Sequence, residues 1–397
     1  MYVSDIARYI LLNNDARSDP RCSRSCQTEA GKLVSKTRSK PRARAIFPAR
    51  GLSALAEDWG LRRYEGLCKR RPPQGFARRR GHFDVGSRFL ITGGGGYIGS
   101  ILVPALLDEG HDVTVVDTFS HGMNTLGGVC TNTRLDIVRA DVRDADKVRL
   151  LATKADYVIP LAALVGAPLC AQDPLGATSI NLDAVKMLVG SLSKEQRVLF
   201  PVTNSGYGVG EAGKFCDENS PLRPISLYGR TKVDAEAAVM DRGNAISFRL
   251  ATVFGMAPRM RIDLLVNDFT YRAVRDRAVV VFEGHFKRNY IHIRDVANGF
   301  LHGIANFDAM KDNAYNMGLS SANLSKLELC ERIAAHVPGF SYLESPIGED
   351  ADKRDYIVSN EKLEATGWSP KHSLDDGIRE LIKGYRMVRN EIYSNVA

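Results

Sequence analysis

The chain of 397 residues lacks any apolar run near the about 18 residues needed to cross a bilayer, so we expect a soluble protein without membrane contact. Cysteine is also scarce: there are seven, an odd number, scattered along the chain. Cys22 and Cys26 lie close together, but no second pair completes a metal site. These absences favour reduced thiols, no bound metal and a cytoplasmic location.

A net positive charge is lacking beyond the first 80 residues. Those 80 residues hold 19 Lys and Arg against 7 Asp and Glu, whereas the remaining residues hold 35 against 39. The formal net charge of +8 therefore arises from the N-terminal segment alone. A nucleic-acid-binding function for the whole protein loses its electrostatic support.

The N-terminal segment, residues 1–85, has little apolar periodicity, and we expect a basic, disordered extension. Its charge fits an arm for nucleic acid or a membrane surface, a transit peptide, or a solvated extension. Methionine is absent between Met1 and Met123, and Val85 stands just before the first expected strand. We therefore hypothesise that translation starts at Val85 and that the extension is not made.

A glycine-rich turn follows the first apolar strand within residues 89–100, where the pattern changes from strand to helix. Glycines let the chain turn sharply, remove Cβ atoms that would block a pyrophosphate, and bring the helix close to the sheet. The helix start then offers unpaired N–H groups and a partial positive charge. Two registers fit such a diphosphate-binding motif: Gly93, Gly96 and Gly99, or Gly94, Gly96 and Gly99.

An acidic residue, Asp117, ends the next apolar strand 24 residues after Gly93. A dinucleotide-binding fold holds the adenosine ribose with a carboxylate near this position. Because a carboxylate there repels a 2′-phosphate, we expect NAD rather than NADP as the cofactor.

Strand and helix patterns alternate after residue 85, which predicts an α/β fold with a Rossmann-like doubly wound parallel sheet. We expect an NAD-binding domain at residues 86–255 and a smaller mixed C-terminal substrate domain at residues 256–397, where proline and glycine break the pattern. Ligands of such sheets bind at the carboxyl ends of the strands. The expected strands are 88–92, 113–117, 137–140, 157–161, 198–202 and 245–250, and two of the expected helices are 178–192 and 231–240.

Tyr228 and Lys232 lie four residues apart, so that phenol and ammonium share one face of an expected helix. A hydroxyl residue, Thr203, ends a strand 25 residues upstream. The unperturbed pKa of tyrosine is about 10, and a nearby lysine together with a positive nicotinamide ring would favour the phenolate. We expect Tyr228 to act as a base toward a substrate hydroxyl, with Thr203 hydrogen-bonding both groups.

The glycine run together with Tyr228 and Lys232 resembles the extended short-chain dehydrogenase/reductase family, in its NAD-dependent nucleotide-sugar epimerase/dehydratase branch, over residues 86–385. The resemblance implies a nucleotide-sugar substrate and a homodimer. Two positions depart from the family pattern, because Pro160 replaces a usual histidine and Thr252 a usual asparagine.

The resemblance also implies roles for residues by their position, and for the glycine run it implies the register that begins at Gly93. The implied cofactor-binding residues are Gly93, Gly96, Tyr97, Ile98, Gly99, Asp117, Asp141, Val142, Leu161, Ala162 and Ala163, with Tyr228 and Lys232. The implied substrate-binding residues are Asn204, Ser205, Asn267, Arg288 and Arg354, and the catalytic ones are Thr203, Tyr228 and Lys232.

The two residues after Thr203 bear on the reaction. Dehydratases of this family carry an acid pair there, because eliminating water needs a proton donor and a base. Asn204 and Ser205 stand at these positions, which favours C4 epimerisation through a transient keto sugar. The alternatives are a nucleotide-sugar dehydrogenase or ketoreductase, a 4,6-dehydratase and, from another class, a catalytically silent NAD-binding regulatory protein.

Two further groups receive structural interpretations. His292 lies in a stretch of alternating apolar and polar residues, so we expect it to make an ordering hydrogen bond rather than to act as a base. Asp375 and Asp376 are expected to cap the helix that follows them.

Overall fold

The computed structural model describes residues 86–211, 213–347 and 354–388. The described residues form one compact unit. The expectations for residues 1–85, including a translation start at Val85, lie outside the described residues.

The main sheet has seven strands in the order β11-β7-β5-β4-β1-β2-β3, and every neighbouring pair is parallel. The chain adds strands outward from β1 in both directions, which is the doubly wound arrangement that the sequence predicts. The strands are β1 (Arg88–Thr92), β2 (Asp112–Asp117), β3 (Leu135–Arg139), β4 (Tyr157–Pro160), β5 (Arg197–Thr203), β7 (Ala245–Leu250) and β11 (Asn313–Met317).

The six expected strands are confirmed to within two residues at each end, but β11 is not among them. Its five residues include two asparagines, so no apolar run marks it in the sequence. It joins the sheet by pairing in parallel with β7, and Asn313 lies opposite Ile246 in the register. The chain thus returns to the main sheet after residue 255, and a clean division at that residue stays a prediction.

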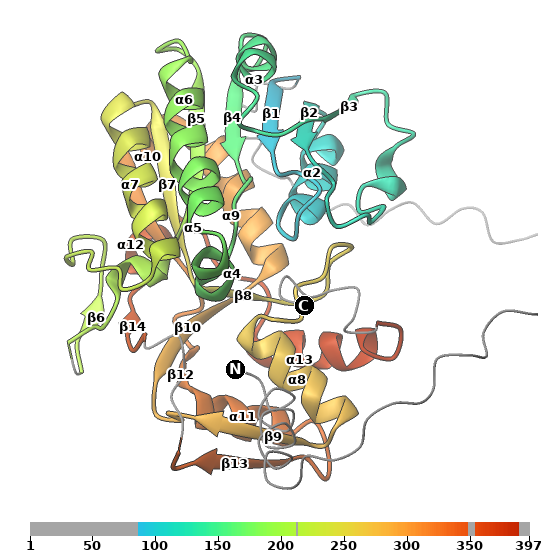
Figure 1. Cartoon of the computed structure of the whole chain (residues 1–397), viewed down its shortest axis with the longest axis vertical. Coiled ribbons are helices and arrows are strands. Elements are labelled where there is room, and N and C mark those ends of the chain that lie inside the picture. The colour runs from blue at the N-terminus through green and yellow to red at the C-terminus, as the bar shows by residue number, and fades with distance from the viewer. Residues whose placement is uncertain (1–85, 212, 348–353, 389–397) are drawn as a thin grey trace, which may run out of the picture. The chain divides into compact units, whose positions relative to one another are not determined.

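Helices cover both faces of the main sheet (Figure 1). On one face, Phe89 and Ile91 of β1 share a core with α2 (Gly99–Asp108) and α9 (Ile293–Ala305). On the other face, Leu90 of the same strand packs with α3 (Ala145–Ala152) and α6 (Ala184–Gly190). Adjacent residues of β1 are therefore buried, as in parallel sheets that are covered on both sides.

The second covered face continues onto α7 (Leu227–Arg242), which extends the helix expected at 231–240. The helix expected at 178–192 is interrupted: α5 (Pro174–Thr178) and α6 flank a π-helical turn at Ser179–Asp183. α4 (Ala167–Gln172) precedes them. The sequence did not reveal this change of helix type, because a π-helical turn changes the backbone hydrogen bonds while the apolar pattern of the side chains stays continuous.

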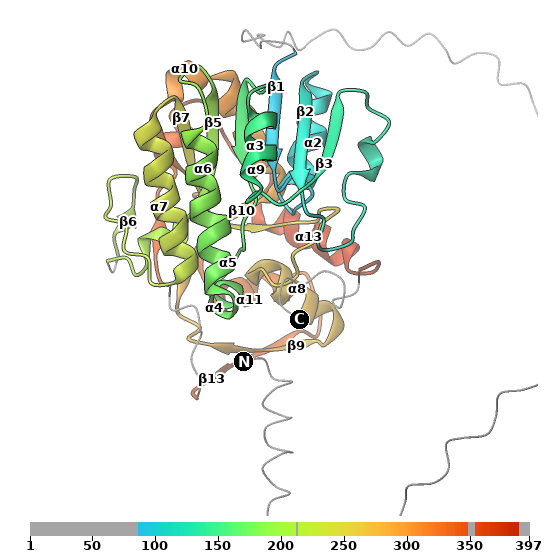
Figure 2. The same cartoon turned by 45° about the horizontal axis from the view of Figure 1, so that its top comes forward.

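Figures 1 and 2 both show a second group of elements beyond one end of the main sheet. It has a three-stranded sheet, β12-β10-β8, and a two-stranded one, β13-β9, while the pair β14-β6 is separate. Its strands are β8 (Thr252–Phe254), β9 (Ala278–Phe282), β10 (Lys287–His292), β12 (Asn323–Ser325) and β13 (Ser341–Ser345); the separate pair is β6 (Phe215–Cys216) and β14 (Ile357–Val358). The remaining α-helices of the described residues are α8 (Leu265–Arg275), α10 (Phe307–Met310), α11 (Lys326–Ala334), α12 (Glu361–Glu364) and α13 (Leu374–Gly384). Short 3-10 helices lie at Gly127–Val129 and Asn204–Tyr207.

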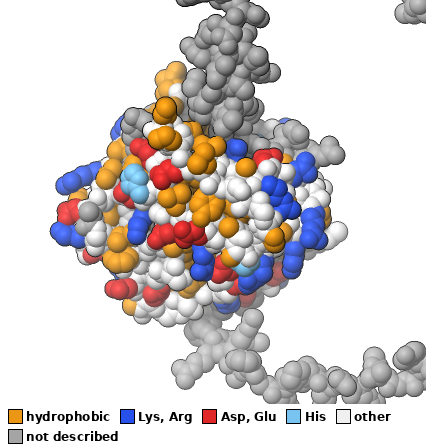
Figure 3. Space-filling view, turned by 90° about the horizontal axis from the view of Figure 1, so that it is seen from below, with side chains coloured by type: hydrophobic (Ala, Val, Ile, Leu, Met, Phe, Trp, Pro, Cys, Tyr) orange, Lys and Arg blue, Asp and Glu red, His pale blue; other side chains and the backbone are white. Residues whose placement is uncertain are grey.

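The surface at this end mixes side chains of every kind. Figure 3 shows apolar side chains gathered on the face with acidic and basic ones interspersed among them. The exposed apolar side chains include Val280, Leu343 and Ile347. Of the helices within the described residues, none is both long and apolar enough to span a membrane.

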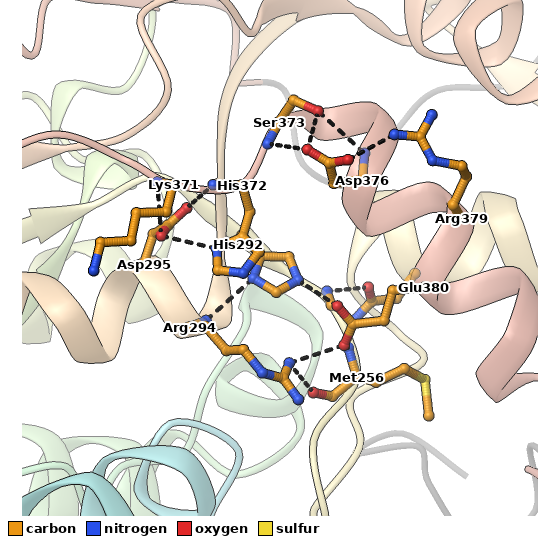
Figure 4. A network of polar contacts seen from close by, with 12 residues as sticks. Met256, His292, Arg294, Asp295, Lys371, His372, Ser373, Asp376, Arg379 and Glu380 are labelled. Atoms are coloured by element: carbon orange, nitrogen blue, oxygen red, sulfur yellow. Dashed lines mark hydrogen bonds and ion pairs between the residues drawn. The ribbon is translucent and has the colours of Figure 1, made fainter. Parts of the chain in front are cut away.

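A network of polar contacts, the C-terminal brace, ties α13 to the start of α9 (Figure 4). His292 caps α9 by accepting from the Arg294 N–H, and its Nε2 lies 2.9 Å from Glu380 Oε2. The Arg294 guanidinium donates to the other oxygen of Glu380 at 2.8 Å, and that oxygen also accepts from the Met256 N–H. The expected ordering hydrogen bonds of His292 are confirmed.

The expected cap of α13 is wrong by a few residues. Ser373 is the capping residue, and it exchanges hydrogen bonds with Asp376 at the third helical position. The acid pair therefore lies within the first turn, where its negative charge still favours the helix start.

A buried ion pair joins α7 to β7. Arg249 Nε lies 3.0 Å from Glu236 Oε1, and the two side chains are 10% and 5% exposed. The Ser247 hydroxyl donates to the same carboxylate. Because both charged groups are removed from water, the stability of each buried charge depends on the opposite charge of its partner.

We expect Arg249→Met to lower the free energy of unfolding by about 3 to 5 kcal/mol, because Glu236 would keep a buried charge without its partner. Arg379→Ala is the control, since it breaks the exposed pair with Asp376 and should cost less than about 1 kcal/mol. Urea unfolding of the two variants measures both changes. Equal costs would contradict the dependence of α7 on this pair.

Candidate active site

A cavity of about 390 Å³ opens at the carboxyl end of the main sheet. Its lining follows β1, β2, β3, β4, β5 and β7, the strands at which the sequence predicts a ligand. β1 and β4 are neighbours whose connections leave toward opposite edges of the sheet, so the loops that follow them diverge. The cavity occupies the resulting crevice.

The glycine loop, residues Gly93–Ile98, forms one wall of the cavity. At Gly93 the φ angle is +73°, and an added Cβ would lie 2.5 Å from the Ala162 nitrogen. At Gly99 an added Cβ would overlap the Gly94 oxygen. Both positions thus exclude side chains, which agrees with the register Gly93, Gly96 and Gly99.

The geometry of this loop fits a diphosphate. An added Cβ at Gly96 would meet only the Gly93 oxygen, at 3.1 Å, so the rest of its surroundings is open. α2 begins directly after the loop and has no side-chain cap at Ile98. The N–H groups of Ser100 and Ile101 already donate to the Gly96 and Ile98 carbonyls, whereas those of Ile98 and Gly99 have no acceptor within the described residues and can bind an anion. The helix dipole favours negative charge there.

Asp117 is held at the edge of the glycine loop. Its carboxylate accepts from the Gly95 N–H at 2.9 Å and from the Phe119 N–H at 2.7 Å. The side chain lines the cavity, so its carboxylate oxygens can accept further hydrogen bonds from ribose hydroxyls. Asp141 also lines the cavity, and the Arg143 guanidinium beside it holds the pKa of its carboxyl below the usual value.

The three expected catalytic residues come together on the cavity wall. Thr203 ends β5, and the Ser226 hydroxyl caps α7 by accepting from the Gly229 N–H at 3.1 Å. This cap starts the helix just before Tyr228 and places Lys232 one turn later. Local capping and strand ending therefore position all three side chains.

Burial dominates the protonation of the pair on α7. It raises the pKa of Tyr228 to about 12, against the opposing charge of Arg261. It lowers the pKa of Lys232 to about 7, against the opposing charge of Glu236. The Lys232 ammonium also lies 4.1 Å from the centre of the Phe200 ring. Without a ligand, the phenol keeps its proton near neutrality.

Thr203 belongs to a line of hydrogen bonds along the cavity wall. Its hydroxyl accepts from the Ser205 N–H at 3.1 Å and lies 2.8 Å from the Ser205 hydroxyl. The Arg354 guanidinium donates to that same Ser205 hydroxyl. Ser205 and Arg354 both line the cavity, as expected for substrate contacts.

Three expected substrate contacts, Asn204, Asn267 and Arg288, do not line the cavity. Asn204 is fully buried, and within the described part of the chain neither atom of its amide has a hydrogen-bond partner. Arg288 lies over the Tyr356 ring, 5.8 Å from its centre. Asn267 is fully buried and uses its amide within the protein. Their substrate roles stay predictions that their positions do not support.

Two arginines that were not expected line the cavity, Arg259 and Arg261. They lie in the arginine loop, residues Gly255–Leu264, and are 2% and 7% exposed. Arg261 Nη2 lies 2.5 Å from Asp263 Oδ2, and Arg259 Nη2 lies 3.2 Å from His121 Nδ1. Arginines in loops are most often solvated, so the residue type alone does not indicate that these two side chains line a cavity.

One group among the described residues has metal-ligating side chains close together: His292, Asp295 and His372, with donor atoms within 4.8 Å of one another. These atoms already form hydrogen bonds in the C-terminal brace (Figure 4). His372 Nδ1 lies 2.9 Å from Asp295 Oδ1, and the two imidazole rings stack. None of the three lines the cavity. We therefore interpret the group as part of the brace.

Comparison with known proteins identifies the fold and the family. The sequence pattern described as "NAD dependent epimerase/dehydratase family" matches residues 89–318, more than half of the chain. The match includes the glycine loop, Tyr228 and Lys232, and it ends just after β11.

Individual relatives cover most of the chain. Low-salt glycan biosynthesis protein Agl12 of Haloferax volcanii is 28% identical over 310 residues, which cover 75% of this chain and 97% of that protein. UDP-glucuronic acid decarboxylase 1 of Arabidopsis thaliana is 26% identical, covering 80% and 72%. The crystal structure of the UDP-glucose 4-epimerase of Thermus thermophilus with NAD superposes with a TM-score of 0.65 at 25% identity, covering 76% and 100%. The names of the last two stand for different reactions, a decarboxylation and an epimerisation.

The open side of Gly96 generates a binding prediction. We expect Gly96→Val to weaken NAD binding at least about tenfold, because a side chain there enters the space of the diphosphate. Gly128→Val is the control, since a Cβ at Gly128 meets nothing within 4 Å. Isothermal titration with NAD measures both. Unchanged affinity in Gly96→Val would contradict the assignment of this loop.

The lowered pKa of Lys232 makes stability depend on pH. The pKa of Lys232 is about 7 in the folded protein and 10.5 in the unfolded chain, so between these pH values the unfolded chain holds a proton on Lys232 that the folded protein has lost. Stability should therefore rise with pH in this window. We expect Lys232→Met to lose this rise, so that the free energy of unfolding of the wild type increases relative to the variant above pH 7. Urea unfolding at several pH values checks it, and a difference that is independent of pH would contradict it.

Proposed function

The chain belongs to the NAD-dependent epimerase/dehydratase family, and from that premise we propose that it epimerises a nucleotide sugar at C4 through a transient keto sugar. In this proposal residues 86–255 bind NAD and residues 256–397 contribute to the substrate side. The observation that carries the proposal is the meeting of Thr203, Tyr228 and Lys232 on the wall of a cavity that also contains the glycine loop.

The cofactor would be held by groups of the first half of the sheet. The glycine loop and the uncapped start of α2 would bind the diphosphate, and Asp117 would accept the adenosine ribose hydroxyls. Leu161, Ala162 and Ala163 line the cavity after β4 and would lie beside the nicotinamide. Bound NAD would supply the acceptor for the hydride from C4 and return that hydride to the other face of the keto sugar.

The protein's own groups would move the proton. Tyr228 takes the proton of the C4 hydroxyl, for which its pKa of about 12 must fall toward neutrality. The positive charges of Arg261 and Arg354 act in that direction, because they favour the phenolate. Lys232 would add to them in its protonated form. Thr203 bonds the same hydroxyl, and Ser205 at 2.8 Å orients the Thr203 hydroxyl.

The charges that line the cavity favour epimerisation over dehydration. Among the described lining residues the carboxylates are Asp117, which ends β2, and Asp141, which follows β3. Thr203 ends β5, on the other side of β1. No described carboxyl group that lines the cavity therefore accompanies the expected catalytic residues, whereas elimination of water needs an acid and a base at the sugar.

The positive side chains support a nucleotide sugar as the substrate. Arg259, Arg261 and Arg354 line the cavity, and guanidinium groups match the geometry of diphosphate oxygens. The sugar and its base would be chosen by the loops that carry these residues.

The test uses UDP-, GDP-, dTDP- and CDP-hexoses that carry deuterium at C4, incubated with the purified full chain. We expect a C4 epimer that retains deuterium at C4, since the hydride returns to the carbon from which it came, without accumulation of free NADH. Nuclear magnetic resonance locates the label. Free NADH would support a dehydrogenase, deuterium at C6 a dehydratase, and no turnover of any sugar a silent NAD-binding protein.

The matched variant is Tyr228→Phe, which keeps the ring and removes the base. We expect its turnover to fall by about 10² to 10⁴, with the fold and NAD binding retained. Tyr342→Phe on β13 is the control, because Tyr342 lies outside the cavity lining and its loss should leave turnover unchanged. Equal turnover in both variants would contradict the role of Tyr228.

A further inference from the structure

The arginine loop, Gly255–Leu264, is held from two sides. On one side, Glu380 of the C-terminal brace accepts from the Met256 N–H (Figure 4). On the other side, the Asn267 amide holds both ends of the segment that leads to Arg261. The position of Arg261 in the cavity therefore depends on residues that do not line the cavity themselves.

Asn267 lies on α8, is fully buried, and uses each atom of its amide. Its Oδ1 accepts from the Gly255 N–H at 3.0 Å. Its Nδ2 donates to the Arg261 carbonyl at 2.8 Å and to the Tyr97 hydroxyl at 3.2 Å. One side chain thus contacts the start of the arginine loop, its arginine and a residue of the glycine loop.

The Tyr97 hydroxyl completes this arrangement. It donates to the Gly255 carbonyl at 2.6 Å while it accepts from Asn267. Tyr97 is 8% exposed, and burial raises the pKa of its hydroxyl above the ordinary value, so it remains a donor. Tyr97 also belongs to the loop whose next residues begin α2, the expected diphosphate site.

We propose that Asn267 is a positioning residue that joins the glycine loop to the arginine loop, so that binding of the dinucleotide at one loop sets Arg261 in place in the other. This rests on the proposed function, since it assigns Arg261 a part in the same reaction. It departs from the sequence expectation, in which Asn267 touches the substrate diphosphate itself.

The consequence for the reaction passes through the charge of Arg261. Arg261 is the strongest of the neighbours that lower the pKa of Tyr228, and Arg354 acts in the same direction. Cys170 and Tyr356 act in the opposite direction. Arg261 in its observed place lowers the pKa of Tyr228, so a displaced Arg261 would raise that pKa and reduce the phenolate fraction at any given pH.

The first test measures backbone hydrogen exchange of the full chain with and without NAD as the probe. In the wild type we expect NAD to slow exchange in the arginine loop. In Asn267→Ala and in Tyr97→Phe, NAD should still bind, but the response of the arginine loop should be lost. Tyr97→Phe removes a single hydroxyl, so it carries the test if Asn267→Ala does not fold.

The second test measures kcat, KM and their pH dependence with the sugar found by the substrate screen. We expect kcat of Asn267→Ala to fall about tenfold at pH 7 and to recover as pH rises, because a rise of about one unit in the pKa of Tyr228 reduces the phenolate tenfold. The double variant with Tyr97→Phe should lose no more than Asn267→Ala alone, because both changes break the same join.

Tyr385→Phe is the matched control. The Tyr385 hydroxyl donates to the main-chain oxygen of Asn267 at 2.8 Å, so its loss loosens the same residue without breaking the amide contacts. This variant should keep the wild-type pH profile. A Tyr385→Phe profile like that of Asn267→Ala, or additive losses in the double variant, would overturn the proposal.

The outcomes separate this inference from the proposed function. If NAD binds and the sugar turns over, but exchange in the arginine loop does not respond to NAD, the inference fails and the function stands. If NAD does not bind to the wild type, both fail. A response of equal size in wild type and Asn267→Ala also overturns the inference alone.

Discussion

The close approach of two loops at Gly93 is the contact on which the site depends. The loop after β1 passes the loop after β4 so closely that a Cβ at Gly93 would lie 2.5 Å from the Ala162 nitrogen. Any side chain there would push the loops apart and displace the start of α2 from Leu161, Ala162 and Ala163. The glycine loop and the residues Leu161–Ala163 line one cavity. This backbone contact therefore keeps the expected diphosphate and nicotinamide positions within a single crevice.

α7 shows that stability and chemistry depend on the same element. The Ser226 cap sets where the helix begins, and the buried pair of Glu236 and Arg249 holds it against β7. Lys232 lies on the same helix, and burial lowers its pKa to about 7 while Glu236 opposes the change. Burial of Lys232 beside the cavity therefore destabilises its charged form, and the nearby Glu236 carboxylate reduces that cost.

The C-terminal half returns to the first half at several points. β11 forms an edge of the main sheet, the C-terminal brace holds Met256, and Asn267 reaches the hydroxyl of Tyr97. Arg261 and Arg354 line the cavity from this half of the chain. In the proposed reaction, the first half of the chain would therefore bind the cofactor that accepts the hydride. The second half would supply positive side chains on the substrate side.

Local patterns explain what was predictable. A glycine run, an acidic residue at a strand end and a Tyr-Lys pair at helical spacing each act over a few residues, so the sequence by itself determined the parallel sheet, the glycine loop, Asp117, Tyr228 and Lys232. β11 was not predictable, because its strand state comes from pairing with β7. Only the tertiary structure decided that Asn267 turns to Tyr97, 170 residues away, and that Arg261 enters the cavity. Such contacts join segments that lie far apart along the chain. Which polar groups pair depends on which ones are buried together, and the residue types alone do not reveal it.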